Sequence, residues 1–203
     1  MSAENNPSTT SAFLDTLRQT TDPAHKRLEA LPISMSLVSP DITLDIYRLY
    51  LELMSRVIYD VEHSLFTEMA ELIPDIDARR KSLMIADDLQ LLDSRNVHDE
   101  LPLQAAGFKY TPAFAMGIMY VIEGSTLGGR VIVKNIKKTL ALDEVRGAKY
   151  FSGYGDGTGH MWRAFLERLT TFEAETKSGE EIIAGAEFAF NVIYQYFKDK
   201  TAA

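Results

Sequence analysis

The stretch that decides the fold is residues 111–140, which read TPAFAMGIMYVIEGSTLGGRVIVKNIKKTL. Thr111 followed by Pro112 is a typical helix start, because a threonine hydroxyl caps free backbone N–H groups and proline is tolerated at the first helical position. Residues 113–136 are apolar enough to be buried over most of their surface, and they contain no proline. We therefore predict one long, buried helix at the centre of the molecule.

Three glycines lie inside this predicted helix, at Gly124, Gly128 and Gly129. Each costs roughly 1 kcal/mol of helix stability relative to alanine. Glycines spaced four and five residues apart share one side of a helix and leave that side without side chains. Such a side permits a kink and lets either a neighbouring helix or a large planar ligand approach the backbone closely. The spacing alone leaves both interpretations open.

The composition fits a globular domain and excludes several classes of function. The chain has 203 residues, a net charge of −8 and no cysteine, which argues against a nucleic-acid partner and excludes disulfides and thiolate metal sites. No apolar run approaches the roughly 20 residues that a membrane-spanning helix needs. The first residues lack the pattern of a secretory signal. We expect a flexible N-terminal tail over residues 1–10, one helical domain over 11–203, no membrane contact and a cytoplasmic location.

Helical periodicity of apolar residues recurs along the rest of the chain, and no convincing strand pattern is present. We predict helices over 11–31, 39–73, 78–92, 161–174 and 178–198, with a glycine- and aromatic-rich loop over 147–160. The predicted helix 78–92 begins with Arg79-Arg80-Lys81, which we interpret as a solvated cluster of cations. The predicted fold class is all-α, with long helices packed around one core.

Few residues could bind a metal, since His25, His63, His98 and His160 are the only histidines. No Glu-x-x-His pair occurs, and His25 with Glu29 four residues later falls short of a zinc or iron site built from side chains alone. His25 lies on the apolar side of the first predicted helix, which is also typical of a hydrogen-bonded core histidine. One helical histidine, a glycine-lined helix and many aromatic residues together suit a flat, iron-bearing macrocycle.

Three segments share their pattern with one family. Residues 120–132, YVIEGSTLGGRVI, resemble the distal helix of the heme oxygenases in their bacterial, biliverdin-producing form. Residues 17–29, with the pattern LR-x-x-T-x-x-AH-x-x-LE, resemble the proximal helix with its iron-ligating histidine. Residues 150–165, with YF-x-GYG followed by WR-x-F, resemble the segment leading into the propionate-binding helix. The likeness extends over residues 11–198.

The resemblance implies a single-domain, multi-helix bundle with heme between a proximal and a kinked distal helix. His25 would be the axial ligand of the iron, Gly124 and Gly128 would lie over the other face of the heme, and Gly129 would allow the kink. Backbone without side chains would leave room for dioxygen beside the macrocycle. The catalytic set implied is Gly124, Ser125 and Gly128.

Other residues complete the implied heme-binding set, which comprises Arg18, His25, Tyr120, Gly124, Gly128, Gly129, Arg163 and Phe190. Arg18 and Arg163 match positions where the family places cations for the propionates, and Phe190 would line the distal wall. The sequence departs from the family at Ser125, where many members have an aspartate that organises the distal water, and near Asp22, where a cation is usual. A serine hydroxyl can hold a water molecule but carries no charge.

The implied activity is the oxidative cleavage of heme to biliverdin, with release of iron and carbon monoxide. Heme would be both cofactor and substrate, O2 the oxidant, and a ferredoxin, flavodoxin or reductase the electron donor, because the sequence has no flavin- or nicotinamide-binding signature. A monomer is the default expectation. Two alternatives remain open: a non-catalytic heme carrier or sensor on the same fold, and a heme-free enzyme of the thiamine-salvage or di-iron kind. The lack of cysteine and of carboxylate–histidine pairs argues against the second.

Overall fold

The structure is a computed structural model that describes residues 7–94, 101–105 and 110–202. Helices account for the regular structure of these residues, and the strand pattern is limited to isolated bridges within the turn 143–147. The all-α class is thus confirmed. The elements in chain order are α1 (Pro7–Glu29), α2 (Pro32–Ser36), α3 (Leu44–Met69), η1 (Ile76–Arg79), α4 (Ser82–Leu91), α5 (Pro102–Ala105), α6 (Pro112–Ser125), α7 (Gly129–Leu140), α8 (Lys149–Ser152), η2 (Gly155–Gly157), α9 (Thr158–Thr176) and α10 (Gly179–Thr201).

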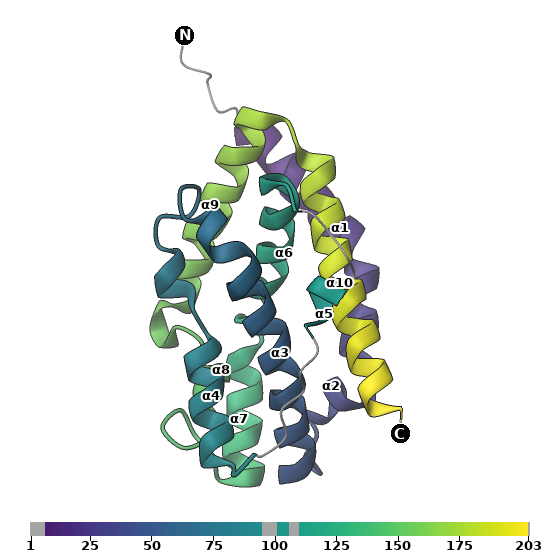
Figure 1. Ribbon diagram of the computed structural model, residues 1–203, viewed down its shortest axis with the longest axis vertical. Helices are drawn as coiled ribbons and strands as arrows, with labels where there is room; N and C mark the ends of the chain where they lie inside the picture. The colour runs from purple at the N-terminus through teal and green to yellow at the C-terminus, as the bar shows by residue number, and fades with distance from the viewer. Residues whose placement is uncertain (1–6, 95–100, 106–109, 203) are drawn as a thin grey trace.

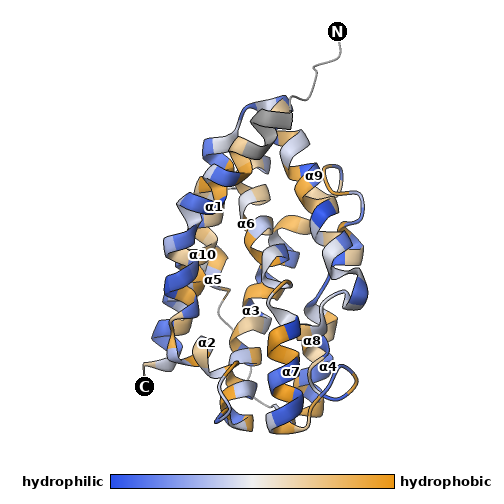
Figure 2. Cartoon of the chain, turned by 180° about the vertical axis from the view of Figure 1, so that it is seen from behind, coloured by the Kyte–Doolittle hydropathy of each residue, from blue (hydrophilic) through white to orange (hydrophobic). Residues whose placement is uncertain are grey.

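Helix α6 lies at the centre of the bundle and packs most extensively against α10, which also lies along α1 (Figure 1). The contact between α6 and α10 is close enough to require glycine on both helices. A Cβ atom on Gly117 would lie 2.0 Å from the carbonyl oxygen of Ile182, and one on Gly185 would lie 2.0 Å from that of Phe114. Hydrophilic residues follow the outer sides of α1 and α10, while apolar residues turn inward (Figure 2).

The predicted helix start at Thr111 is confirmed, because its hydroxyl accepts a hydrogen bond from the backbone N–H of Phe114 at 3.2 Å. The predicted single helix over 113–136 is wrong in one respect. It divides into α6 and α7, and residues 126–128 form a turn between them. The hydroxyls of Ser125 and Thr126 each donate to a backbone carbonyl three residues earlier, at 2.7 Å, and these bonds compete with the regular helical pattern. The expected kink is therefore a break.

Several predicted boundaries also differ from the structure. Helix α1 begins at Pro7, so residues 7–10, which we expected in the tail, are helical, and α1 continues through Pro23. Helix α3 begins after Thr43, whose hydroxyl accepts from the N–H of Ile46, and not at the Ser39 segment. Residues 1–6 lie outside the described residues. The loop over 147–160 contains the short helices α8 and η2.

The cluster Arg79-Arg80-Lys81 was predicted to be solvated, and this is wrong for two of its three residues. Arg79 is 1% exposed and Lys81 is 2% exposed, while Arg80 remains at the surface. The run does not open a helix either, because η1 ends at Arg79 and α4 begins at Ser82. Both buried cations point toward the end of α6, next to the functional site.

Candidate functional site

A cavity of about 1010 Å³ lies among α1, α3, α6, α7, α9 and α10, and the segment around α2 closes one side of it. Its volume is at the upper end of the range of typical ligand sites. The lining is mostly apolar, with a small number of polar side chains contributed by α1 and by the end of α6. Such a cavity suits a large, flat, mainly apolar ligand that carries a few charged groups.

His25 lines this cavity from α1, and its side chain is 51% exposed. Its Nε2 atom lies 3.2 Å from Oε1 of Glu29, one helical turn later. A carboxylate in this position orients an imidazole and raises its basicity as a metal ligand. The ring centroid of Phe190 lies 5.4 Å from that of His25. Phe190, which we expected on the distal wall, is therefore a neighbour of the histidine.

The turn between α6 and α7 forms another wall, to which Gly124 and Gly128 both contribute. We call residues 124–128 the glycine turn. A Cβ atom on Gly124 would meet the Trp162 ring at 3.5 Å, and one on Gly128 would meet only the Ser125 carbonyl oxygen at 3.8 Å. Gly124 and Gly128 thus present backbone to the cavity.

Gly129 has a different role from the one that we expected. It is not among the residues lining the cavity, and a Cβ atom on it would lie 2.1 Å from the backbone carbonyl oxygen of Phe151. Glycine is required here because the start of α7 touches the backbone of α8. The three glycines therefore do not share one side, and Gly129 serves packing.

Ser125 also lines the cavity, and its hydroxyl donates to the carbonyl oxygen of Ile122 at 2.7 Å. The Ser125 side chain also lies near the hydroxyl of Tyr150, which is buried. Burial raises the pKa of Tyr150 well above its ordinary value, and the nearby Ser125 hydroxyl lowers this pKa in part. Burial likewise raises the pKa of Tyr50, another lining residue, to about 12. The polar groups beside the glycine turn are therefore neutral hydroxyls.

The two predicted propionate cations are placed differently. Arg18 lines the cavity with its side chain 54% exposed, and it lies near Tyr120, whose pKa is raised by burial and lowered in part by the Arg18 cation. Arg163 is exposed and is not a lining residue. At the rim, the Asp22 carboxylate lies 2.7 Å from Nζ of Lys26. Of the described lining residues, Arg18 alone is a lysine or arginine.

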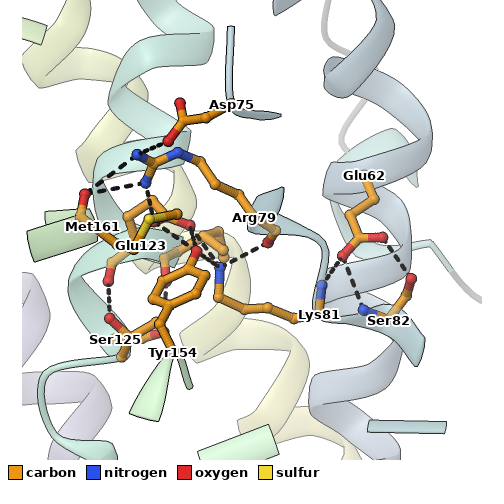
Figure 3. Close-up of polar contacts among 11 residues, drawn as sticks. Glu62, Asp75, Arg79, Lys81, Ser82, Glu123, Ser125, Tyr154 and Met161 are labelled. Carbon is orange, nitrogen blue, oxygen red and sulfur yellow. Dashed lines mark hydrogen bonds and ion pairs between the residues drawn. The ribbon is translucent and has the colours of Figure 1, made fainter. Parts of the chain in front are cut away.

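Sequence reasoning missed a buried ionic cluster behind the glycine turn (Figure 3). The Glu123 carboxylate accepts from Nη1 of Arg79 at 2.6 Å, from Nζ of Lys81 at 2.6 Å and from the Tyr154 hydroxyl at 2.9 Å. We call these four residues the Glu123 cluster. Burial and the adjacent carboxylate raise the pKa of Tyr154, which stays protonated as a donor. One signal was available, since Glu123 is the only charged residue in the segment 113–125.

Metal sites built from side chains alone are absent from the described part of the chain, where no group of three or more His, Cys, Asp or Glu residues could hold a metal ion. His25 would thus be a single ligand, which is what iron already held by a macrocycle requires. His63 is exposed and stacks on Tyr59, outside the cavity. His98 lies outside the described residues. None of the helices described is long and apolar enough to cross a membrane.

Comparison with solved structures gives a consistent set of similar folds. The chain is 26% identical to the NO- and CO-bound heme oxygenase from Neisseria meningitidis, with a TM-score of 0.76 over 92% of this chain and 90% of that one. A heme oxygenase from Leptospira interrogans shares the fold at 17% identity and a TM-score of 0.78, over 92% and 98% of the two chains. The heme complex of heme oxygenase-1 from the cyanobacterium Synechocystis also shares the fold, at 16% identity and a TM-score of 0.74, over 94% of this chain and 92% of that one.

Curated proteins gave no match in the corresponding search. The family model described as heme oxygenase matches residues 11–199, which is nearly the whole chain. This match includes the α1 histidine and the glycine turn, the two features that line the cavity from different elements. The resemblance seen in the sequence is therefore confirmed: the chain belongs to the heme oxygenase family and is an enzyme that degrades heme.

Proposed function

We propose that this enzyme binds heme in the cavity with His25 as the iron ligand, and cleaves it with O2 and external electrons to biliverdin, iron and carbon monoxide. The observation that carries the proposal is the shared cavity of about 1010 Å³, lined both by the α1 histidine and by the bare backbone of Gly124 and Gly128. A histidine ligand alone would equally suit a heme carrier. Two glycines in the neighbouring wall, which carry no side chains, would leave space for a second small molecule at the iron.

The residues of the cavity fit heme as a ligand. His25, with Glu29 as its carboxylate partner, would hold the iron, and Phe190 would pack beside the imidazole. Arg18 and Tyr120 would bind a propionate, because a guanidinium and a hydroxyl both donate to carboxylate oxygens. The apolar majority of the lining would exclude water from the macrocycle. Arg163 lies away from the cavity and is left out of this set.

When bound, heme supplies the iron chemistry that activates O2 with electrons from a donor. The protein's part is to shape the space and to hold protons. Gly124 and Gly128 leave the face of the ligand open, and the hydroxyl of Ser125, which is bonded to the Ile122 carbonyl and lies near Tyr150, would hold a water molecule at the end of α6. This arrangement replaces the aspartate of other family members by neutral donors. The electrons would come from a ferredoxin, a flavodoxin or a reductase, acting on a monomer.

The proposal is tested by titrating the purified protein with heme and then adding reductant in air. We expect the wild type to form a Soret band that is consumed as biliverdin and carbon monoxide appear. His25→Ala should lose the ligand-dependent part of the Soret band, while His63→Ala, which changes an exposed histidine outside the cavity, should match the wild type. A Soret band that persists under reductant would overturn the proposed reaction, and a wild-type spectrum in His25→Ala would overturn the assigned ligand.

A further inference from the structure

We propose that Glu123 is a positioning residue, whose buried carboxylate holds the glycine turn in place as a wall of the cavity. Glu123 directly precedes Gly124, but it is not among the lining residues. Its side chain extends instead into the Glu123 cluster on the other side of α6 (Figure 3). The catalytic consequence rests on the proposed function, whereas the structural consequence can be tested without heme.

The cluster ties the end of α6 to three other segments. Lys81 donates to Glu123, to Tyr154 at 2.9 Å and to the carbonyl oxygen of Arg79 at 3.1 Å. Arg79 donates to Glu123 and, at 3.3 Å, to the carbonyl oxygen of Met161 in α9. Residues 79–81 and 154, which are distant in sequence from α6, thereby meet on one carboxylate, and Arg79 links this carboxylate to residue 161. A displacement of Glu123 would break its bonds to Arg79, Lys81 and Tyr154.

The charges of this network balance. Arg79 and Lys81 are two cations, and Glu123 and Asp75 are two carboxylates, with Asp75 2.7 Å from Nη2 of Arg79. The first three are 1–2% exposed. A buried ion pair gives little net stability compared with apolar residues of the same shape, because both charges lose their hydration. Fixing one arrangement of the backbone is therefore the better account of the cluster.

The glycine turn needs support from this side. Gly124 and Gly128 have no side chains to pack, and Leu127 between them is 47% exposed. On the far side of the turn, Gly129 rests on the carbonyl oxygen of Phe151. The turn is thus held at its start by Glu123 and at its end by α8, and both supports lie outside the cavity. Its own bonds are short-range, such as Leu127 N–H to the Gly124 carbonyl at 3.1 Å.

Hydrogen exchange of the heme-free protein tests the structural part. We expect Glu123→Gln to speed the exchange of amides 126–132 at least tenfold, and Tyr154→Phe, which keeps both cations on the carboxylate, to speed it at least threefold. Asp60→Asn is the matched control. Asp60 is also buried, but it accepts from the N–H groups of Leu103 and Gln104 at the start of α5, so its effect should stay at α5.

Unchanged exchange at 126–132 in Tyr154→Phe would overturn the proposal, as would an equal increase there in Asp60→Asn. If Glu123→Gln does not fold, the exchange rates of amides 126–132 in Tyr154→Phe decide whether the cluster holds the glycine turn. With heme bound, the C–O stretching band of the carbon monoxide complex and the ratio of biliverdin isomers should change in Tyr154→Phe and match the wild type in Asp60→Asn. A mere loss of stability would lower the amount of product without altering the isomer ratio. If the wild type makes no biliverdin, the proposed function fails, and hydrogen exchange still decides the role of Glu123.

Discussion

The two walls of the cavity are built in opposite ways. The α1 wall carries its functional group on a regular helix, where His25 is half exposed and its polar partner is Glu29 on the same helix. The glycine turn presents the backbone of Gly124 and Gly128 and the neutral hydroxyl of Ser125, and it is held by the Glu123 cluster and by α8. One wall offers an imidazole, and the other offers mainly backbone.

The two walls differ in how much support they need from the rest of the fold. A histidine on a helix surface can be placed by helix geometry alone, since positions four residues apart are neighbours. A backbone wall must be held from behind, because glycines give nothing to pack on the cavity side. We therefore expect substitutions on the α1 wall to affect binding with little change in folding. Substitutions behind the glycine turn should affect folding first.

The largest expected effect contrasts two neighbouring arginines. Arg79→Met should lower the free energy of unfolding by about 3–5 kcal/mol, because it leaves buried Glu123 with one cation fewer. Arg80→Met should cost less than about 1 kcal/mol, because Arg80 is 43% exposed and its ion pair with Asp77 is at the surface. Urea unfolding of the heme-free proteins measures both.

Equal losses of unfolding free energy in the two variants would contradict this contrast. They would favour the prediction from the sequence, in which residues 79–81 are all solvated. The double variant Arg79→Met with Glu123→Gln tests whether the loss in Arg79→Met comes from its pairing with Glu123. Removing both partners should cost less than the sum of the single variants, as expected for residues in one ionic network.

A smaller effect separates the glycines. Gly129→Ala should lower the free energy of unfolding by about 2–3 kcal/mol, because the new methyl group would overlap the backbone of Phe151. Gly128→Ala should be neutral or more stable by up to about 1 kcal/mol, since its φ of −73° suits alanine and no side chain is near. Heme titration should then show weaker binding in Gly128→Ala. A stable Gly129→Ala would contradict the packing role of this residue.

These contrasts also mark what could be predicted from the sequence. The helical class, the Thr111 cap and the helical position of His25 could be predicted. They depend on periodicity and capping, which involve residues that are close together in the sequence. The resemblance of residues 120–132 to the distal helix of the family implied the place of Gly124 and Gly128, which their spacing alone left open. Each of these signals lies within a few residues along the chain.

The remaining features depend on contacts between distant segments. Gly129 faces Phe151, and the burial of Arg79 and Lys81 follows from Glu123, more than 40 residues away. A run of three cations gives no local sign that two of them are buried. The single charge inside the apolar part of α6 was the one usable signal, because a buried carboxylate requires partners.

The smallest expected effect on folding belongs to the residue that we propose as the iron ligand. His25→Ala should change the free energy of unfolding of the heme-free protein by no more than about 0.5 kcal/mol, because the side chain is 51% exposed and its partner Glu29 is also at the surface. Added heme should then separate the two proteins, since a ligand that binds only the folded state stabilises it by about 2.7 kcal/mol at 100 times its Kd. Thermal unfolding with and without heme should show this shift in the wild type and a much smaller one in His25→Ala. A large loss of stability in the heme-free variant would instead make His25 a residue of the core, and the contrast between the two walls would fail.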